Sequence, residues 1–230
     1  MKKRMNSEAQ EQPQEAFIPV PEIHLYGRNA VVYIEDEICP DLINPIVHYI
    51  IQENVDPTVD EITLFIDSPG GDLCSAWKLI DLMAISRIPI RTVGIGGVMS
   101  AALLIMMAGH IRMVSINTEV MSHQPTFNAS SMSAQLRDFD SMSAMFGKTF
   151  TRIVDFYKKH TGLSEDKLKE VLLGASDEWL TAEEAVSYGF ADHIVQDFGT
   201  DFWKLFEPLE FEDDEDEPTE AQTPEPAPVA

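Results

Sequence analysis

The chain has 230 residues, 44% of them hydrophobic and 24% charged, which is enough apolar surface for one domain with a sizeable core. Its 16 Lys and Arg against 39 Asp and Glu leave a net charge of −23, which argues against nucleic acid and anionic membrane surfaces as partners. Ten acidic residues and no Lys or Arg stand from Glu207 onward, so much of this charge belongs to the end of the chain.

Both ends of the chain differ in composition from its middle. Residues 1–16 are polar, rich in Gln and Glu and without periodicity, whereas residues 207–230 combine a charge run with prolines. Neither segment can build a core. We therefore predict a flexible N-terminal arm, one globular domain over residues 17–206, and a disordered tail that acts as a solubilising extension.

The cysteines and the apolar segments bear on the compartment. Cys39 and Cys74 are too few for a disulfide framework and lack the paired spacing of a zinc site, which favours a reducing compartment. We interpret both as small buried side chains. No apolar segment follows the basic start of residues 1–16, and the longest apolar stretch, 98–108, is shorter than the ~20 residues of a membrane span. A cytoplasmic location is predicted.

The middle of the chain alternates between strand and helix patterns. Short, β-branched and apolar runs predict four buried strands, at 30–34, 62–66, 90–95 and 111–115. Residues 41–53 and 71–86 lie between successive strands and are predicted as helices, the second with one apolar face. Strands separated by crossover helices indicate a layered α/β fold with a mostly parallel sheet.

Residues 132–160 depart from that alternation, because apolar positions recur there every three or four residues without a proline. These positions are Met132, Leu136, Phe139, Phe146, Phe150, Ile153 and Tyr157. A helix of this length measures about 43 Å, longer than a compact domain of this size covers. We expect it to project and to bury its stripe against another subunit; the alternative is a helix folded back on its own sheet.

Two short helices are predicted towards the end of the domain. Ser164 is a candidate N-cap for the first of them. Thr181 and Glu184 have the spacing of a capping box for the second, which is expected to end near Gly189.

Two turns at strand ends carry residues suited to chemistry. Ser68-Pro69-Gly70-Gly71 follows a strand and precedes a helix, so its glycines offer unobstructed N–H groups that suit an anion, although a plain turn has the same pattern. Ser100 follows another strand and opens an apolar helix, which presents its hydroxyl as a candidate nucleophile. Its surroundings differ from Gly-x-Ser-x-Gly, and an N-cap serine is the alternative.

A base and an orienting carboxylate complete the set of candidates. His123 stands at the end of an apolar strand just before Pro125, where an imidazole is held rigidly and faces a cleft. Asp177 lies in a short connection beside Trp179 and Leu180, apolar residues that are expected to limit its solvation. By spacing alone, Asp177 is one loop carboxylate among several.

Taken together, these segments resemble the proteolytic subunit of the ATP-dependent Clp protease, the ClpP family. Ile-Asp-Ser-Pro-Gly-Gly at 66–71, Ser100 eight residues before Ala-Gly, and Met-Ser-His-Gln-Pro at 121–125 are similar to motifs of that family. Asp177 before Trp-Leu, and the run 181–192, are similar to its closing segment. The resemblance covers about residues 30–195.

The resemblance implies a crotonase-like fold whose long helix, about residues 126–160, is the handle of the family. It implies a tetradecamer of two stacked heptameric rings that receives unfolded polypeptides from a Clp-type ATPase. It assigns Ser100 as nucleophile, His123 as base and Asp177 as the orienting acid, with Gly70, Gly71 and Ala101 binding the oxyanion and substrate. No metal or organic cofactor is implied, and ATP is used only by the partner.

The chain also departs from the family pattern. Val98 and Met99 replace small residues before the serine, so we expect them to narrow the primary pocket or shift the turn. Residues 126–131 replace a glycine-rich stretch that lines the substrate groove and locks the rings. Too few residues lie between residues 18–21 and the strand at 30–34 for the family's first helix, and the family's axial gate is built from that region.

Three alternatives stay open beside a ring-forming serine endopeptidase. The first is a catalytically silent ring subunit that assembles with an active ClpP homologue, which the altered residues around Ser100 favour and retention of the triad opposes. The second is a processing protease of narrow specificity that works without an unfoldase. The third is another crotonase-fold enzyme, a hydratase or a serine-lysine peptidase, and is not favoured.

Overall fold

The computed structural model describes residues 23–126 and 136–196. The strands are β1 (Ile23–Tyr26), β2 (Asn29–Glu35), β3 (Glu61–Ser68), β4 (Ile90–Met99), β5 (Arg112–Ser115), β6 (Glu119–Ser122), β7 (Glu178–Leu180) and β8 (His193–Val195). The helices are α1 (Pro40–Val55), α2 (Leu73–Ile85), α3 (Ala101–Met107), α4 (Leu136–Thr161), α5 (Glu165–Lys167), the π-helix η1 (Leu168–Leu172) and α6 (Ala182–Ser187). The predicted boundaries of the arm and the tail lie outside the described residues.

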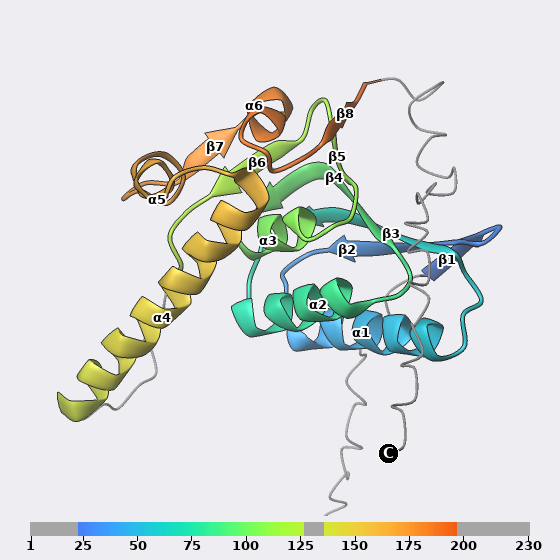
Figure 1. The fold of residues 1–230 in the computed structure, drawn as a ribbon, viewed down its shortest axis with the longest axis horizontal. Coiled ribbons are helices and arrows are strands. Elements are labelled where there is room, and N and C mark those ends of the chain that lie inside the picture. The colour runs from blue at the N-terminus through green and yellow to red at the C-terminus, as the bar shows by residue number, and fades with distance from the viewer. Residues whose placement is uncertain (1–22, 127–135, 197–230) are drawn as a thin grey trace, which may run out of the picture.

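The strands form one mixed sheet in the order β1-β2-β3-β4-β5-β8, and helices pack against it (Figure 1). The strands β2, β3, β4, β5 and β8 run parallel, whereas β1 is antiparallel to β2. Off this path, β6 pairs in parallel with the end of β4, and β7 pairs antiparallel with β6. The α/β class predicted from the sequence is confirmed; its crotonase-like subtype stays a prediction.

The central strand β4 is longer than predicted. It continues past residue 95 through Gly96 and Gly97, because the Asp67 carboxylate accepts the Gly97 N–H at 2.9 Å. Gly96 has φ +60°, and a Cβ atom there would lie 2.7 Å from the same carboxylate. The extension lets β4 leave β5 and pair with β6 over its last three residues.

Alternation along the strands separates two apolar clusters. Ala30, Val32 and Ile34 of β2 belong to the main core, on the side that α1, α2 and α3 cover (Figure 1). Val31 belongs instead to a small cluster on the other side with residues such as Phe65 and Val93. Both sides are apolar, as a largely parallel sheet requires, which explains the near-continuous hydrophobic runs of β2 and β3.

The long helix α4 projects from the body (Figure 1). It has 26 residues, from Leu136 to Thr161, within the predicted range 132–160 except for its last residue. Near its C-terminal end, Ile153 and Tyr157 are buried in the main core, whereas Met145 is 53% exposed. The first part of the predicted stripe, up to Phe139, lies outside the described side chains. What covers the projecting part, and its role as a handle, stay predictions.

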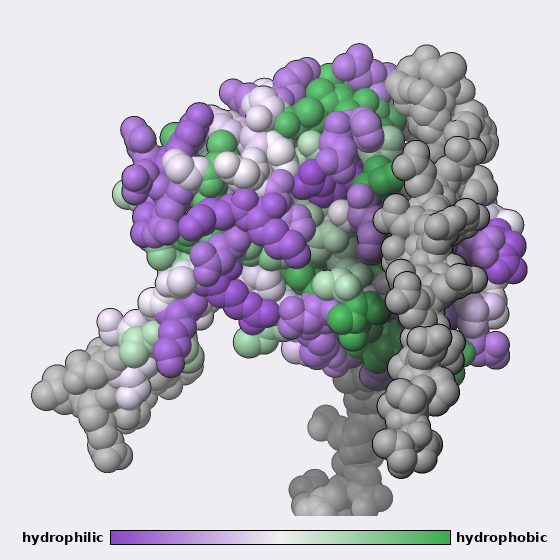
Figure 2. Space-filling model, in the orientation of Figure 1, coloured by the Kyte–Doolittle hydropathy of each residue, from purple (hydrophilic) through white to green (hydrophobic). Residues whose placement is uncertain are grey.

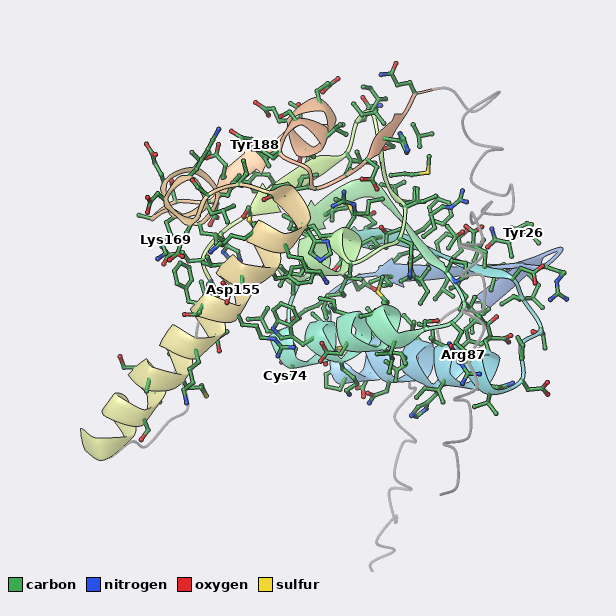
Figure 3. All side chains as sticks on the ribbon, viewed as in Figure 1. Tyr26, Cys74, Arg87, Asp155, Lys169 and Tyr188 are labelled. Carbon is green, nitrogen blue, oxygen red and sulfur yellow. The ribbon has the colours of Figure 1, made fainter. Side chains whose placement is uncertain are left out.

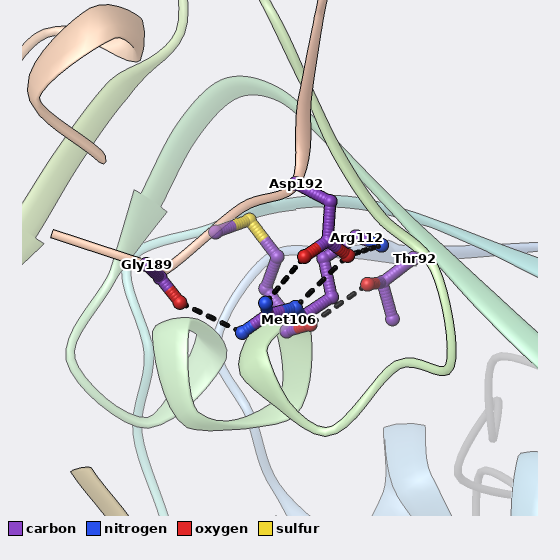
Figure 4. Close-up of polar contacts among 5 residues, drawn as sticks. All are labelled: Thr92, Met106, Arg112, Gly189 and Asp192. Atoms are coloured by element: carbon purple, nitrogen blue, oxygen red, sulfur yellow. Dashed lines mark hydrogen bonds and ion pairs between the residues drawn. The ribbon is translucent and has the colours of Figure 1, made fainter. Parts of the chain in front are cut away.

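The predicted helix caps near the end of the domain are confirmed. Ser164 accepts the N–H of Lys167, and Thr181 and Glu184 form a reciprocal capping box. The segment after α6 is tied to β5 through Arg112, which donates to the carbonyl of Gly189 at 2.7 Å and pairs with Asp192 (Figure 4). These contacts fix the C-terminal elements to the sheet.

An apolar area lies on the surface where α1 and α2 end (Figure 2). Ile51, Val55 and Ile85 are exposed there, the last two to 80% and 77%. Exposed apolar side chains that gather in one area often mark an interaction site. No helix within the described ranges is long and apolar enough to cross a membrane.

Candidate active site

The candidate residues come together at one edge of the sheet. The strands β3, β4 and β6 are parallel, and Ser68, Val98 and Val120 lie side by side in register. The carboxyl ends of these strands therefore meet. The segments that follow them carry Gly70, Ser100 and His123, as expected for residues after strands of a parallel sheet.

Ser100 occupies a sharp turn between β4 and α3. Its φ of 54° and ψ of −119° are rare for a residue other than glycine, and its N–H donates to the carbonyl of Met121 at 2.9 Å. Such a backbone costs about 1–3 kcal/mol and persists only where its surroundings fix it, typically at functional sites. A strained serine between a strand and a helix is the geometry of a nucleophile elbow. Ser100 holds the N-cap position of α3, but its side chain accepts none of the helix N–H groups.

His123 contacts Ser100 directly. The Nε2 atom of His123 lies 2.6 Å from the Ser100 hydroxyl, which is hydrogen-bond distance. The imidazole is only about 20% exposed. A nucleophile in contact with a base that is shielded from solvent can lose its proton as it attacks.

Asp177 lies on the other side of the imidazole, as the pairing of β6 with β7 requires. In that antiparallel pair Val120 is opposite Leu180 and Ser122 is opposite Glu178, so one further step sets His123 opposite Asp177. The Asp177 Oδ1 atom is 3.5 Å from Nδ1 of His123, slightly beyond a good hydrogen bond. A proton on Nδ1 towards Asp177 leaves Nε2 as acceptor for the serine.

The solvation of Asp177 differs from the prediction. Its side chain is 57% exposed, because the neighbouring Leu180 turns into the core and Trp179 is itself half exposed. The apolar neighbours of the sequence therefore do not shield this carboxylate from water.

The predicted oxyanion and substrate groups lie beside Ser100 with one complication. A Cβ atom on Gly70 would lie 2.8 Å from Cβ of Ser100 and 2.9 Å from the N atom of Ala101, so only glycine fits this turn. The Gly70 N–H donates to the Ser68 hydroxyl at 3.1 Å and is thus engaged within its own turn. Ala101 and Gly71 line the adjacent cavity.

A cavity of about 400 Å³ opens next to Ser100 and His123. Its apolar wall consists of Leu73, Leu104, Met145, Phe146 and Ile153 from α2, α3 and α4. Asp72 also lines it; a hydrogen bond from Ser75 lowers the pKa of this carboxyl, so it is ionised at neutral pH.

One expectation about this cavity and two about the burial of the cysteines need correction. Val98 and Met99 are not among its described lining residues, and Val98 packs in the core against Gly94, so their bulk does not narrow the cavity. Cys74 was expected to be buried, but it is exposed at the start of α2, where it lines the cavity (Figure 3). Cys39 is only partly buried.

The sequence did not single out a polar cluster behind His123. The buried Ser122 hydroxyl lies 2.9 Å from the hydroxyl of Tyr157 and donates to the carbonyl of Leu172 at 2.6 Å. Gln124 donates to the next carbonyl, that of Leu173, at 2.8 Å. The sequence signal for this cluster was the polar residue on each side of His123, Ser122 before it and Gln124 after it, at the end of an apolar strand.

Among residues 23–126 and 136–196, no group of three or more His, Cys, Asp or Glu side chains is placed to hold a metal ion. The chemistry considered for this site rests on the protein's own side chains. That no cofactor takes part stays a prediction.

Comparison with known proteins shows the family of the chain. A sequence model of the Clp protease family matches residues 23–198. A protein of Nocardia farcinica named ATP-dependent Clp protease proteolytic subunit 2 is 29% identical over 171 residues, 73% of this chain and 81% of the relative. Its namesake in Tropheryma whipplei is 30% identical over 71% of this chain and 89% of the relative. The proteolytic subunit of Bdellovibrio bacteriovorus is 25% identical over 74% and 80%. The chain is a divergent member of the Clp protease family.

Proposed function

We propose that the protein is a serine endopeptidase that hydrolyses peptide bonds with Ser100, His123 and Asp177. The observation that carries the proposal is the contact of 2.6 Å between His123 Nε2 and the hydroxyl of Ser100, which is held at positive φ. The names of the relatives, proteolytic subunits of the Clp protease, support the same reaction class.

In the proposed reaction the Ser100 Oγ atom attacks the peptide carbonyl carbon while His123 Nε2 takes the serine proton. Asp177 stabilises the resulting imidazolium. His123 then gives the proton to the leaving amine nitrogen as the C–N bond breaks, which leaves an acyl ester on Ser100. Water attacks this ester and loses a proton to His123, which returns it to the serine oxygen as the acid is released.

The N–H groups of Ala101 and Gly70 are proposed to bind the negatively charged carbonyl oxygen of the tetrahedral intermediate. Each such donor contributes about 2.7–4 kcal/mol in comparable enzymes. The Gly70 N–H donates to the Ser68 hydroxyl at 3.1 Å and must turn from it to take this role. Gly71 and the apolar cavity are proposed to hold the substrate chain.

The proposed assembly is a pair of stacked heptameric rings in the cytoplasm, fed with unfolded polypeptides by a Clp-type ATPase. The projecting α4 and the exposed aliphatic side chains at the ends of α1 and α2 offer surfaces on which copies of the chain can pack. The relatives are named ATP-dependent, which supports an ATPase partner.

A catalytically silent ring subunit, assembled with an active homologue, is the second candidate. The exposed Asp177 and its separation of 3.5 Å from His123 favour it, because the imidazole is held loosely on that side. The close contact between Ser100 and His123 opposes it.

The test is labelling of the purified protein with a fluorophosphonate, together with its native mass. We expect rapid labelling that is lost in Ser100→Ala and strongly reduced in His123→Ala, in a particle of about fourteen subunits. Ser187→Ala removes an exposed hydroxyl from α6 and serves as the matched control that labels normally. An intact ring that takes no label contradicts the endopeptidase and favours the silent subunit.

A second assay separates degradation from processing. A degradative enzyme cleaves unfolded casein at many sites when an unfoldase is present, and it cleaves short peptides alone. A narrow processing protease leaves casein intact under both conditions. Ser100→Ala provides the blank for each substrate.

A further inference from the structure

Behind the catalytic histidine, three hydroxyl and carbonyl groups form a buried chain of hydrogen bonds. Ser122, the last residue of β6, is fully buried, and Tyr157 of α4 is 2% exposed. The Ser122 Oγ atom contacts the hydroxyl of Tyr157 at 2.9 Å and the carbonyl of Leu172 at 2.6 Å. The cluster thus joins β6, α4 and η1 at one point.

The chemistry of the three groups fixes the direction of this chain. A carbonyl oxygen only accepts, so the single proton of Ser122 is donated to Leu172. Ser122 then has only lone pairs for Tyr157, and the phenol must be the donor. Burial raises the pKa of Tyr157 to about 12, so the phenol keeps its proton at neutral pH. The order is Tyr157 to Ser122 to Leu172.

The accepting carbonyls belong to the end of the π-helix η1. The last carbonyls of a helix lack partners within the helix and need other donors. The carbonyl of Leu172 receives Ser122, and that of Leu173 receives the amide of Gln124 at 2.8 Å. The two residues that flank His123 are therefore anchored to consecutive carbonyls of the segment that continues directly to Asp177. Turns of π-helix are frequent at functional sites.

We propose that Ser122 and Tyr157 are positioning residues that set the separation between His123 and Asp177. Their hydrogen bonds hold the end of β6 against the segment leading to Asp177, with α4 as the third support. Asp177 itself is exposed and directly precedes β7, a strand of only three residues, so little else fixes it. This inference rests on the proposed function. The hydroxyls of Ser122 and Tyr157 do not contact the substrate and act only through the position of His123 and Asp177.

Apolar side chains at the positions of Ser122 and Tyr157 could not replace their hydrogen bonds. Two apolar side chains at these positions would fill the space but leave the Leu172 carbonyl without a donor in a buried environment. An unsatisfied buried carbonyl is unfavourable, so the end of η1 would shift towards another donor. A shift of the reactive groups by about 1 Å is enough to lower turnover up to a hundredfold.

The experiment compares Tyr157→Phe and Ser122→Ala with wild type in steady-state hydrolysis of a fluorogenic peptide. We expect kcat to fall about tenfold or more in each variant while KM changes less than twofold, because the ring of Tyr157 still lines the cavity. The double variant is expected to be no slower than the slower single variant, since both substitutions break one chain of hydrogen bonds.

The matched control is Tyr188→Phe. Tyr188 projects from the end of α6 (Figure 3) and packs, like Tyr157, near the ring of Phe190. Removing its hydroxyl tests the loss of a phenol in the same aromatic cluster, and we expect kcat to stay within twofold of wild type.

The outcomes separate this inference from the proposed function. Wild-type kcat retained in folded Tyr157→Phe and Ser122→Ala, or a loss confined to KM, overturns the positioning role while the endopeptidase stands. A wild-type protein without peptidase activity contradicts the proposed function, and crystal structures then decide: a separation of His123 and Asp177 wider by 1 Å or more in Ser122→Ala, in which the Leu172 carbonyl loses its donor, supports the inference, and an unchanged separation overturns it.

Discussion

The two contacts of His123 are built in different ways. On one side, Ser100 lies 2.6 Å from the imidazole, on a strained turn between a buried strand and a buried helix. On the other side, Asp177 lies 3.5 Å away, 57% exposed, next to a strand of three residues. The main core fixes Ser100 and His123, whereas the proposed side-chain hydrogen bonds behind His123 fix Asp177 at a sheet edge. Substitutions on the first side should therefore damage activity more.

The largest effect is expected for His123→Ala. Removing the base leaves the Ser100 hydroxyl without a proton acceptor, and comparable triads then lose roughly 10⁵-fold or more in kcat. Peptide hydrolysis measured against His193→Ala, which removes an exposed histidine on β8, gives the comparison. A loss below a hundredfold would show that another group accepts the proton.

Gly70→Ala disturbs the Ser100 side of His123 without changing the side chain of Ser100, His123 or Asp177. The added Cβ atom would lie 2.7 Å from the carbonyl of Met99 and 2.8 Å from Ser100 Cβ, so the turn and the serine must move. We expect about a thousandfold lower kcat, since both oxyanion binding and the elbow are disturbed. Gly27→Ala is the control, because Gly27 also has positive φ, at +63°, but has nothing within 4 Å of the added atom. Similar activity losses in both variants would refute the close-contact argument.

Asp177→Ala tests the exposed side. Water can reach the imidazole where the carboxylate was, so we expect kcat to fall by about a hundredfold, less than the ~10⁴-fold lost with the aspartate of comparable triads and well short of the loss in His123→Ala. The measurement is kcat at saturating peptide. A loss equal to that of His123→Ala would mean that the acid is as firmly built into the site as the base.

The smallest effect concerns stability in acid. Burial, helped by the charges of Lys159 and Arg112, lowers the pKa of His160 to about 4, with Asp192 opposing the shift. An unfolded chain binds this proton below about pH 6.5, so the free energy of unfolding falls as the pH decreases from 6.5 to 4. Because the imidazole is only partly buried and solvent screens its charge, the decrease is on the order of 2 kcal/mol, less than the full shift of the pKa would give.

The segment at risk is the junction of α4 with α5 and η1, which supports the Asp177 side. His160→Phe keeps the ring next to Phe156 and removes the titration, so chemical unfolding at several pH values should show a flatter acid dependence. An unchanged slope between pH 6.5 and 4 would assign the acid dependence to other groups.

Much of the fold followed from local pattern. The strand cores, α1, α2 and the capping box at Thr181 were predicted because buried strands and capped helices have strong signals over a few residues. The extension of β4 was missed, since Gly96 and Gly97 indicate a turn until the distant Asp67 is known to hold them in the strand. β1 was missed because four residues carry too little pattern.

The site was predictable in its parts and less so in its surroundings. Ser100, His123 and Asp177 stood out by strand ends and by resemblance, and the structure brings all three together. The exposure of Asp177 depends on which way β7 turns its side chains, which three residues do not reveal. Tyr157 was assigned to an apolar stripe, because its partner Ser122 is 35 residues away and no local pattern links them.

The backbone of Ser100 has a consequence for how stability and activity trade against each other. Its φ of 54° suits glycine better than serine, so Ser100→Gly should relieve strain and raise the melting temperature while it abolishes hydrolysis. If the inactive variant is more stable than the active protein, the strained backbone at Ser100 lowers stability in exchange for turnover. The difference in melting temperature between the two proteins measures how large that loss of stability is.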